Sequence, residues 1–286
     1  MSDQSSRQWP PLFVRLACCA VVLYAGTRAL AGEEATANQP SKADVAHKRL
    51  EIMTSRIESI VVTSTDPAVP KQMQSTPLFR YDDETRGYVD GTIWRLGEKG
   101  RPLAIITAEL HPKYLGGGSR VIYDFLSLTE RPFTARSLDV AGWSPGGSAV
   151  ALKALAGAPL PAAEPAKRLT QLKQQARRFS GTQIVQELDK TSVQLRLLPR
   201  EIYRYSPAAH ELADGAMFLL VNGRNPALLL MVETDGKTWQ YGVGRLSSPS
   251  TLKVELDDVL VWSEPPFTSF EWSHPYTASN SAAEFP

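Results

Sequence analysis

Residues 80–109 read RYDDETRGYVDGTIWRLGEKGRPLAIITAE, and residues 204–233 read RYSPAAHELADGAMFLLVNGRNPALLLMVE. The two stretches align without a gap at a shift of 124 positions. Seven of the thirty pairs are identical: Arg80/Arg204, Tyr81/Tyr205, Asp90/Asp214, Gly91/Gly215, Leu96/Leu220, Pro102/Pro226 and Glu109/Glu233. Average residue usage would give about two identical pairs by chance. Because self-similarity at a fixed distance marks a repeated structural unit, we predict that the chain contains an internal duplication.

An apolar stripe with helical spacing precedes each copy. Before the first copy, the stripe consists of Ala46, Leu50, Met53, Ile57 and Ile60. Ser41 and Asp44 lie at its start like a capping box. The second helix is expected to begin at Pro165, a residue that suits a first turn. Its stripe consists of Leu169, Leu172, Ala176 and Phe179.

Each copy is strand-like, with a glycine- and proline-containing loop between two apolar runs. The runs 88–96 and 103–110 flank the first loop, and 212–221 and 227–233 flank the second. Such pairs predict hairpins. Further strand-like segments follow without helices between them, which favours an antiparallel meander. The predicted fold class is therefore α+β, with two tandem homologous units, each an N-terminal helix packed on an antiparallel β-meander.

The second hairpin is more continuously apolar than the first, so we expect its strands to be covered on both faces.

The domain boundaries follow from these patterns and from composition. We predict a signal peptide (1–31), a disordered linker (32–40), a first α+β unit (41–157), a Pro/Ala linker (158–164), a second α+β unit (165–267) and a peripheral tail (268–286).

The N-terminus has the features of an export signal. Arg7 and Arg15 precede an apolar run over 16–26, and a small-x-small site ends at Ala31. The run is too short to span a bilayer, which takes about 20 residues. We expect cleavage after Ala31, a secreted or periplasmic protein, and no stable membrane anchor.

Cleavage would also remove both cysteines, which leaves no disulfide, thiolate nucleophile or cysteine-ligated metal. The mature chain would carry 28 basic and 29 acidic residues. A nearly neutral chain has no field that would recruit nucleic acid, so no nucleic-acid partner is expected.

Motifs of catalysis are weak in this chain. Gly142-Trp143-Ser144-Pro145-Gly146 matches the serine-hydrolase elbow, but Pro145 lacks the N–H that would bind an oxyanion. Gly116-Gly117-Gly118-Ser119 lacks the lysine of a phosphate-binding loop. The histidines show no metal-binding spacing: His47, His111, His210 and His274. We therefore assign no catalytic residue, no metal and no cofactor.

The repeated polar residues are the candidate binding or structural pairs: Arg80, Tyr81 and Glu109, with Arg204, Tyr205 and Glu233. Each arginine is expected to face the glutamate of its copy across neighbouring strands. Residues kept in both copies serve most simply the shared fold. The alternative is a pair of equivalent binding sites, or one site at the junction of the copies.

Residues 195–205 read LRLLPREIYRY and are followed by Asp214-Gly215-Ala216-Met217-Phe218. The first copy has the related segments Pro77-Leu78-Phe79-Arg80-Tyr81 and Asp90-Gly91. On these residues rests a resemblance to a family of secreted proteins from planctomycete bacteria. It implies an exported bacterial protein and brings no activity, cofactor or catalytic residue.

Two functions follow as hypotheses. The favoured one is a non-enzymatic binding or interaction module, with an unknown ligand or protein partner in a cleft between the units or on the concave face of a sheet. The alternative is an extracytoplasmic hydrolase of a polymer or ester, using Glu109, His111 and Glu233. An enzyme is the less favoured reading. Carboxylates that converge in one deep pocket would favour it, whereas a groove without them would favour binding.

Overall fold

Two antiparallel sheets contain most of the strands in the computed structural model, which describes residues 40–286 except 115–116, 186–190 and 207–211. The predicted signal peptide and all but the last residue of the predicted linker lie outside the described residues, as do Gly116 and His210. The described part contains two α-helices and sixteen strands. None of its helices is long and apolar enough to cross a membrane.

The smaller of the two sheets has five strands in the order β16-β5-β4-β3-β2. Their bounds are β2 (Phe79–Asp83), β3 (Tyr88–Leu96), β4 (Ala104–His111), β5 (Arg120–Ser127) and β16 (Tyr276–Ala282). A 3-10 turn, η1 (Glu84–Arg86), joins β2 to β3. A separate two-stranded sheet pairs β1 (Val61–Thr63) with β6 (Thr134–Arg136).

The larger sheet has nine strands in the order β15-β14-β8-β9-β11-β12-β13-β7, with β10 also paired to β11. Their bounds are β7 (Lys153–Ala154), β8 (Phe179–Val185), β9 (Thr191–Leu197), β10 (Tyr203–Tyr205), β11 (Asp214–Asn222), β12 (Asn225–Thr234), β13 (Trp239–Arg245), β14 (Ser250–Leu256) and β15 (Val259–Glu264). The sheet curls, and the Lys153 amine of β7, at one end, donates to the Val261 carbonyl of β15, at the other end (3.0 Å).

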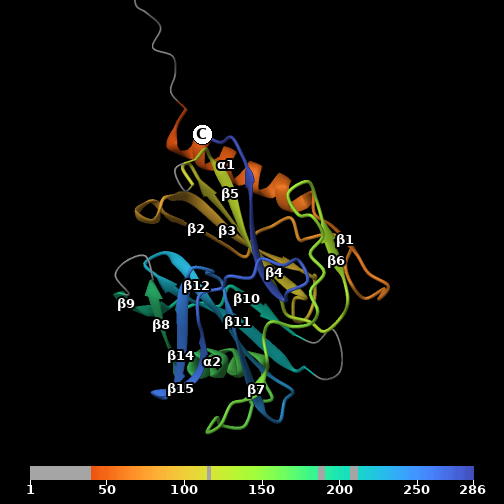
Figure 1. Ribbon diagram of the computed structural model, residues 1–286. Coiled ribbons are helices and arrows are strands. Elements are labelled where there is room, and N and C mark those ends of the chain that lie inside the picture. Colours follow the sequence, from red (N-terminus) through yellow and green to blue (C-terminus); the bar gives the residue numbers. More distant parts are fainter. Residues whose placement is uncertain (1–39, 115–116, 186–190, 207–211) are drawn as a thin grey trace, which may run out of the picture. The chain divides into compact units, whose positions relative to one another are not determined.

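Each α-helix covers one sheet. The helix α1 (Lys42–Glu58) begins at the predicted capping box, in which Ser41 and Asp44 bond reciprocally, so this prediction is confirmed. The helix α2 (Pro165–Ala176) has proline in its first turn. In Figure 1, α1 lies over the five-stranded sheet and α2 lies against the nine-stranded sheet.

Alternation along the strands divides the interior into three hydrophobic clusters. Trp94 and Ile106 face α1, whereas their neighbours Ile93 and Ile105 face the other sheet. In the nine-stranded sheet, Phe218 and Leu220 pack with Leu172 of α2, and the residues that alternate with them along β11, Met217, Leu219 and Val221, join the cluster between the sheets. Every residue of β11 is buried, which confirms that the second hairpin is covered on both faces.

The predicted fold class of two tandem α+β units is wrong. The described chain is mostly β, and its sheets are large and curled instead of two meanders each carrying a helix. Strand order is also not consecutive, because β8 and β9 lie between β14 and β11. The repeated stretch covers only a central hairpin and its flanks, so it does not specify how more distant strands pair.

Two strands pair in a sheet that the predicted domain boundaries do not assign to them. The strand β7 lies within 41–157 but pairs with β13 of the nine-stranded sheet. Residues 268–286, which the sequence assigns to a peripheral tail, contain β16, which pairs with β5 over seven residues. Tyr276 in this strand is only 3% exposed.

Candidate functional site

The repeated tyrosine, glycine and glutamate form one motif across three strands. Tyr81, Gly91 and Glu109 lie opposite one another on β2, β3 and β4, and the Tyr81 hydroxyl donates to Glu109 Oε1 (3.0 Å). A Cβ on Gly91 would lie 2.6 Å from Cε2 of Tyr81. Glycine therefore leaves room for the ring to lie across β3 and reach the glutamate.

The second copy repeats this motif between the sheets. Tyr205, Gly215 and Glu233 lie opposite one another on β10, β11 and β12, and the Tyr205 hydroxyl donates to Glu233 Oε2 (3.0 Å). Burial, followed by the nearby glutamate, raises the pKa of Tyr81 and of Tyr205 well above the ordinary value. Both phenols thus stay protonated and act as hydrogen-bond donors.

The repeated arginines do not face the glutamates as expected. Arg80 Nε donates to Asp90 Oδ1 (2.8 Å), and Arg204 Nε donates to Asp214 Oδ1 (3.0 Å). Successive side chains of a strand point to opposite faces, so an arginine next to the motif tyrosine points to the helix side. There, Arg80 donates to the carbonyl of Ala46 in α1, and Arg204 donates to that of Pro165 in α2.

The two glutamates have different side-chain partners. His111 Nε2 lies 3.1 Å from Glu109 Oε2, so these two hydrolase candidates do meet. Glu233 instead receives a bidentate contact from Arg101, whose Nε lies 3.0 Å from Oε2. Arg101 belongs to the loop between β3 and β4, so a loop of the first copy holds the glutamate of the second.

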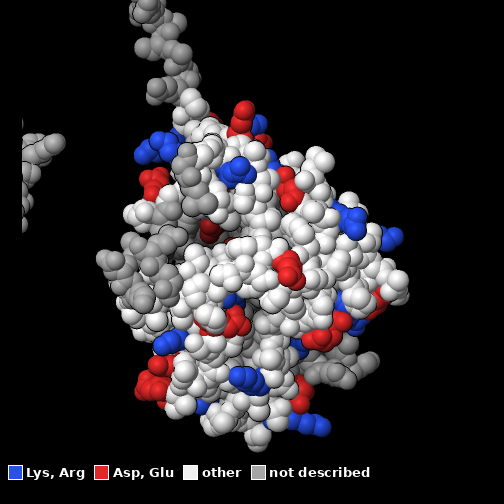
Figure 2. Space-filling view, viewed as in Figure 1, with Lys and Arg blue, Asp and Glu red and all other residues white. Residues whose placement is uncertain are grey.

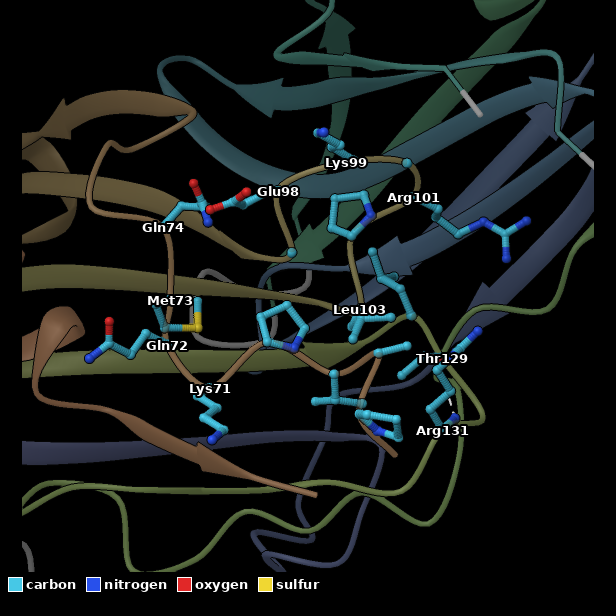
Figure 3. A pocket seen from close by; sticks show the side chains of 18 of the residues that line it. Lys71, Gln72, Met73, Gln74, Glu98, Lys99, Arg101, Leu103, Thr129 and Arg131 are labelled. Carbon is cyan, nitrogen blue, oxygen red and sulfur yellow. Dashed lines mark hydrogen bonds between the residues drawn. The ribbon is translucent and has the colours of Figure 1, made fainter. Parts of the chain in front are cut away.

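The same loop forms one wall of the largest cavity described, a groove of about 1200 Å³. Figure 3 shows Glu98, Lys99 and Arg101 along one wall, Lys71, Gln72 and Met73 along a second, and Thr129 and Arg131 along a third. The hydroxyl of Tyr203 donates to the Glu98 carbonyl (3.2 Å), which fixes the loop to the second copy. Sequence reasoning missed this groove because its walls are irregular loops without a motif.

Two smaller cavities share Arg101 with the groove. One of about 190 Å³ is polar and includes Glu233 and Asp235 in its wall. The other, of about 300 Å³, has an aliphatic wall: Leu128, Val150, Ala151, Leu152 and Met231. No aromatic side chain of the described residues lines any of these three cavities. Glu109 and His111 line none of the four cavities described.

The remaining sequence candidates lie in structural surroundings. Ser144 Oγ lies 2.7 Å from the hydroxyl of Thr134, and no histidine is near it among its described hydrogen bonds. His47 is exposed beside Glu51 on α1. Trp143 and Trp239 are buried in the two helix-side clusters. No group of three or more potential metal ligands occurs among the described residues.

Comparisons with protein-family models, with curated proteins and with solved structures found no match for this chain.

Proposed function

We propose that this protein is an exported, non-enzymatic binding module, and that its ligand is an extended polypeptide segment held in the groove beside Arg101. The observation that carries the proposal is the groove itself, which is far larger than the other cavities described and is walled by three loop segments, 67–75, 97–103 and 128–131. Binding residues are commonly placed on loops that a rigid scaffold positions.

The lining supports a polypeptide ligand. Its floor is aliphatic and proline-rich, with Val69, Met73, Pro102 and Leu103, and its rim is polar. Sugar rings and nucleobases are commonly bound by stacking on aromatic side chains, and the described lining offers none. Lys71 and Glu98 at the rim are exposed, so both signs of charge are present. Figure 2 likewise shows positive and negative residues interspersed on the face that it displays.

The hydrolase alternative has less support. Glu109 and Glu233 are each already engaged by a tyrosine hydroxyl and a cationic or ionisable partner. Only Glu233 lines a described cavity, and its carboxylate is held there by Arg101. A general acid or base needs to reach a bound substrate.

The test is binding to an immobilised array of extended peptides, with an array of glycans beside it. Gln72, an exposed residue of the groove wall, is changed to tryptophan to obstruct the groove. The matched control is Gln194→Trp, at an exposed position on β9. We expect the protein to bind a subset of peptides, with affinity reduced at least tenfold by Gln72→Trp and unchanged by Gln194→Trp.

Equal binding by both variants, or binding confined to glycans, would reject the groove as a peptide site. Hydrolysis of an ester or peptide that disappears in Glu109→Gln, at an unchanged melting temperature, would instead establish the enzyme alternative.

A further inference from the structure

A carboxylate that the duplication does not predict lies buried between the sheets. Asp124 on β5 is 7% exposed. Its side chain points to the same face of the sheet as that of Leu126, which belongs to the cluster between the sheets. The hydroxyl of Tyr276 donates to its Oδ1, and Thr107 Oγ1 donates to its Oδ2 (3.2 Å). Tyr276 is the first residue of β16, so Asp124 bonds directly to the C-terminal strand.

The charges around Asp124 come from several elements. Glu109 lies on the same face of β4, diagonally across the strand pair, since Asp124 is opposite Thr107. Glu109 in turn contacts Tyr81 of β2 and His111, which is charged only when it is protonated.

Arg245 of β13 approaches from the other sheet. It is 4% exposed, and its guanidinium lies 5.3 Å from the centre of the Tyr276 ring. Its N–H groups are engaged by the carbonyls of Ser247, Ser250 and Pro265, and Nη1 lies 3.4 Å from Glu264. His274 Nδ1 lies 3.2 Å from the backbone nitrogen of Tyr276. Toward the other end of β16, Arg120 donates to Asn280 Oδ1 (2.8 Å), and Arg56, which pairs with Asp139, donates to Ser281 Oγ (2.8 Å).

These surroundings make the charged form of Asp124 costly. Burial is the largest cause that raises its pKa, to about 7, and the nearby Glu109 acts in the same direction. The hydrogen bonds from Tyr276 and Thr107 and the charge of Arg245 oppose the rise. Asp124 therefore changes charge in the range between weakly acidic and neutral pH.

We propose that Asp124 and Tyr276 form a proton-controlled clamp that holds the C-terminal strand β16 against the five-stranded sheet, most tightly in acid. When Asp124 is protonated, its buried carboxyl group carries no charge beneath β16. When it ionises, the strand covers a carboxylate that water would solvate better, and separation of β16 becomes less costly.

The sign follows from the two pKa values. In the docked state the pKa of Asp124 is raised to about 7, whereas an aspartate in water has an ordinary value of about 4. The docking of β16 on the five-stranded sheet is thus most stable below pH ~4. Its stability falls as the pH rises toward 7 and stays constant above that pH. Within that window, the open fraction grows by up to about tenfold per pH unit.

The second copy supplies an internal control. In the same register, Gly242 stands opposite Met231 where Asp124 stands opposite Thr107. The glutamate of that copy, Glu233, is paired with Arg101, which keeps its charge at all these pH values. The second copy therefore has no titrating group at the position that corresponds to Asp124. Only the five-stranded sheet, which contains β16, has one there.

The experiment is hydrogen exchange of the backbone amides of β16 from pH 5 to pH 8, with rates corrected for intrinsic exchange. For the wild type we expect protection of residues 277–282 to fall by up to about tenfold per pH unit between pH 5 and 7, and to level off above pH 7. Asp124→Asn, which has the same shape but does not titrate, should give protection independent of pH.

Two further variants distinguish the clamp from a merely structural contact. Tyr276→Phe removes a hydrogen bond that favours the charged carboxylate, so the loss of protection should continue above pH 7. Glu233→Gln is the matched carboxylate-to-amide control and should keep the wild-type pH dependence. The proposal is overturned if Asp124→Asn keeps that dependence, or if protection changes equally in every strand of both sheets.

Discussion

The repeated residues are explained by contacts that each copy makes within itself. Tyrosine, glycine and glutamate form a row across three strands, as with Tyr205, Gly215 and Glu233. Arginine and aspartate tie the opposite face to a helix, as with Arg204 and Asp214. These contacts account for five of the seven identical pairs, which supports a structural role for the candidate site residues.

Gly215 tests this explanation at the scale of one residue. A Cβ at this position would lie 2.3 Å from Cε2 of Tyr205, so Gly215→Ala must displace the ring from Glu233. We expect a loss of about 1–3 kcal/mol in the free energy of unfolding, as for other overpacked sites. Chemical denaturation measures it.

Gly118 provides the control, because a Cβ there meets nothing within 4 Å. Gly118→Ala should change stability little. In a Tyr205→Leu background, Gly215→Ala should cost much less than in the wild type, because the ring is gone. Strictly additive losses in the double variant would refute the motif.

At the scale of elements, the nine-stranded sheet brings its two ends together. The edge strand β15 exposes Val259 and Leu260, which would invite pairing with another chain. Lys153 of β7 places its amine on the Val261 carbonyl of this edge. Proteins often protect edges with lysine, and here the lysine comes from the opposite end of the same sheet.

Lys153→Ala should therefore promote self-association more than it lowers stability. We expect the loss in unfolding free energy to stay near 1 kcal/mol, the usual value of one hydrogen bond. Sedimentation velocity over a range of protein concentrations should show dimers or larger species that the wild type lacks. Lys237→Ala, at an exposed turn position, is the control and should behave as the wild type. A Lys153→Ala variant that sediments like this control would exclude edge protection by Lys153.

At the scale of the molecule, the two sheets share one core. The cluster between them combines Ile93 and Leu126 of one sheet with Met217 and Leu229 of the other. The hairpin loop of each copy also contacts the other copy. Arg101 of the first loop pairs with Glu233, and Arg224 of the second loop pairs with Asp82 (2.6 Å). Residues 41–157 and 165–267 are thus interdependent in packing, whatever their origin.

This interdependence predicts one cooperative unfolding transition for residues 40–286. Calorimetry should give a single peak whose van't Hoff and calorimetric enthalpies agree. A chain limited to residues 41–157 would lack β16 and the facing sheet, and its circular dichroism should show no stable fold. Two separate transitions, or a folded 41–157 fragment, would mean that the halves are independent.

The sequence predicted local structure well. The capping box at Ser41 and Asp44, the start of α2 at Pro165 and the two-sided burial of β11 follow from neighbouring residues, because capping and periodicity are local properties. The repeat identified Tyr81 and Glu109, but the partner of Arg80 was mispredicted, because alternation sends its side chain to the other face.

Only the tertiary structure decided which distant segments meet. The pairing of β16 with β5, the contact of β7 with β13 and the placement of Asp124 beneath Tyr276 join residues far apart in the chain. The groove beside Arg101 exists because loops from separate strands face each other. The sequence by itself determined where the helices begin, the hairpins and the repeated motif, although Phe179, predicted on the second helix, is the first residue of β8. Long-range packing decided the sheets and the candidate site, because burial of apolar faces selects partners without regard to their separation in sequence.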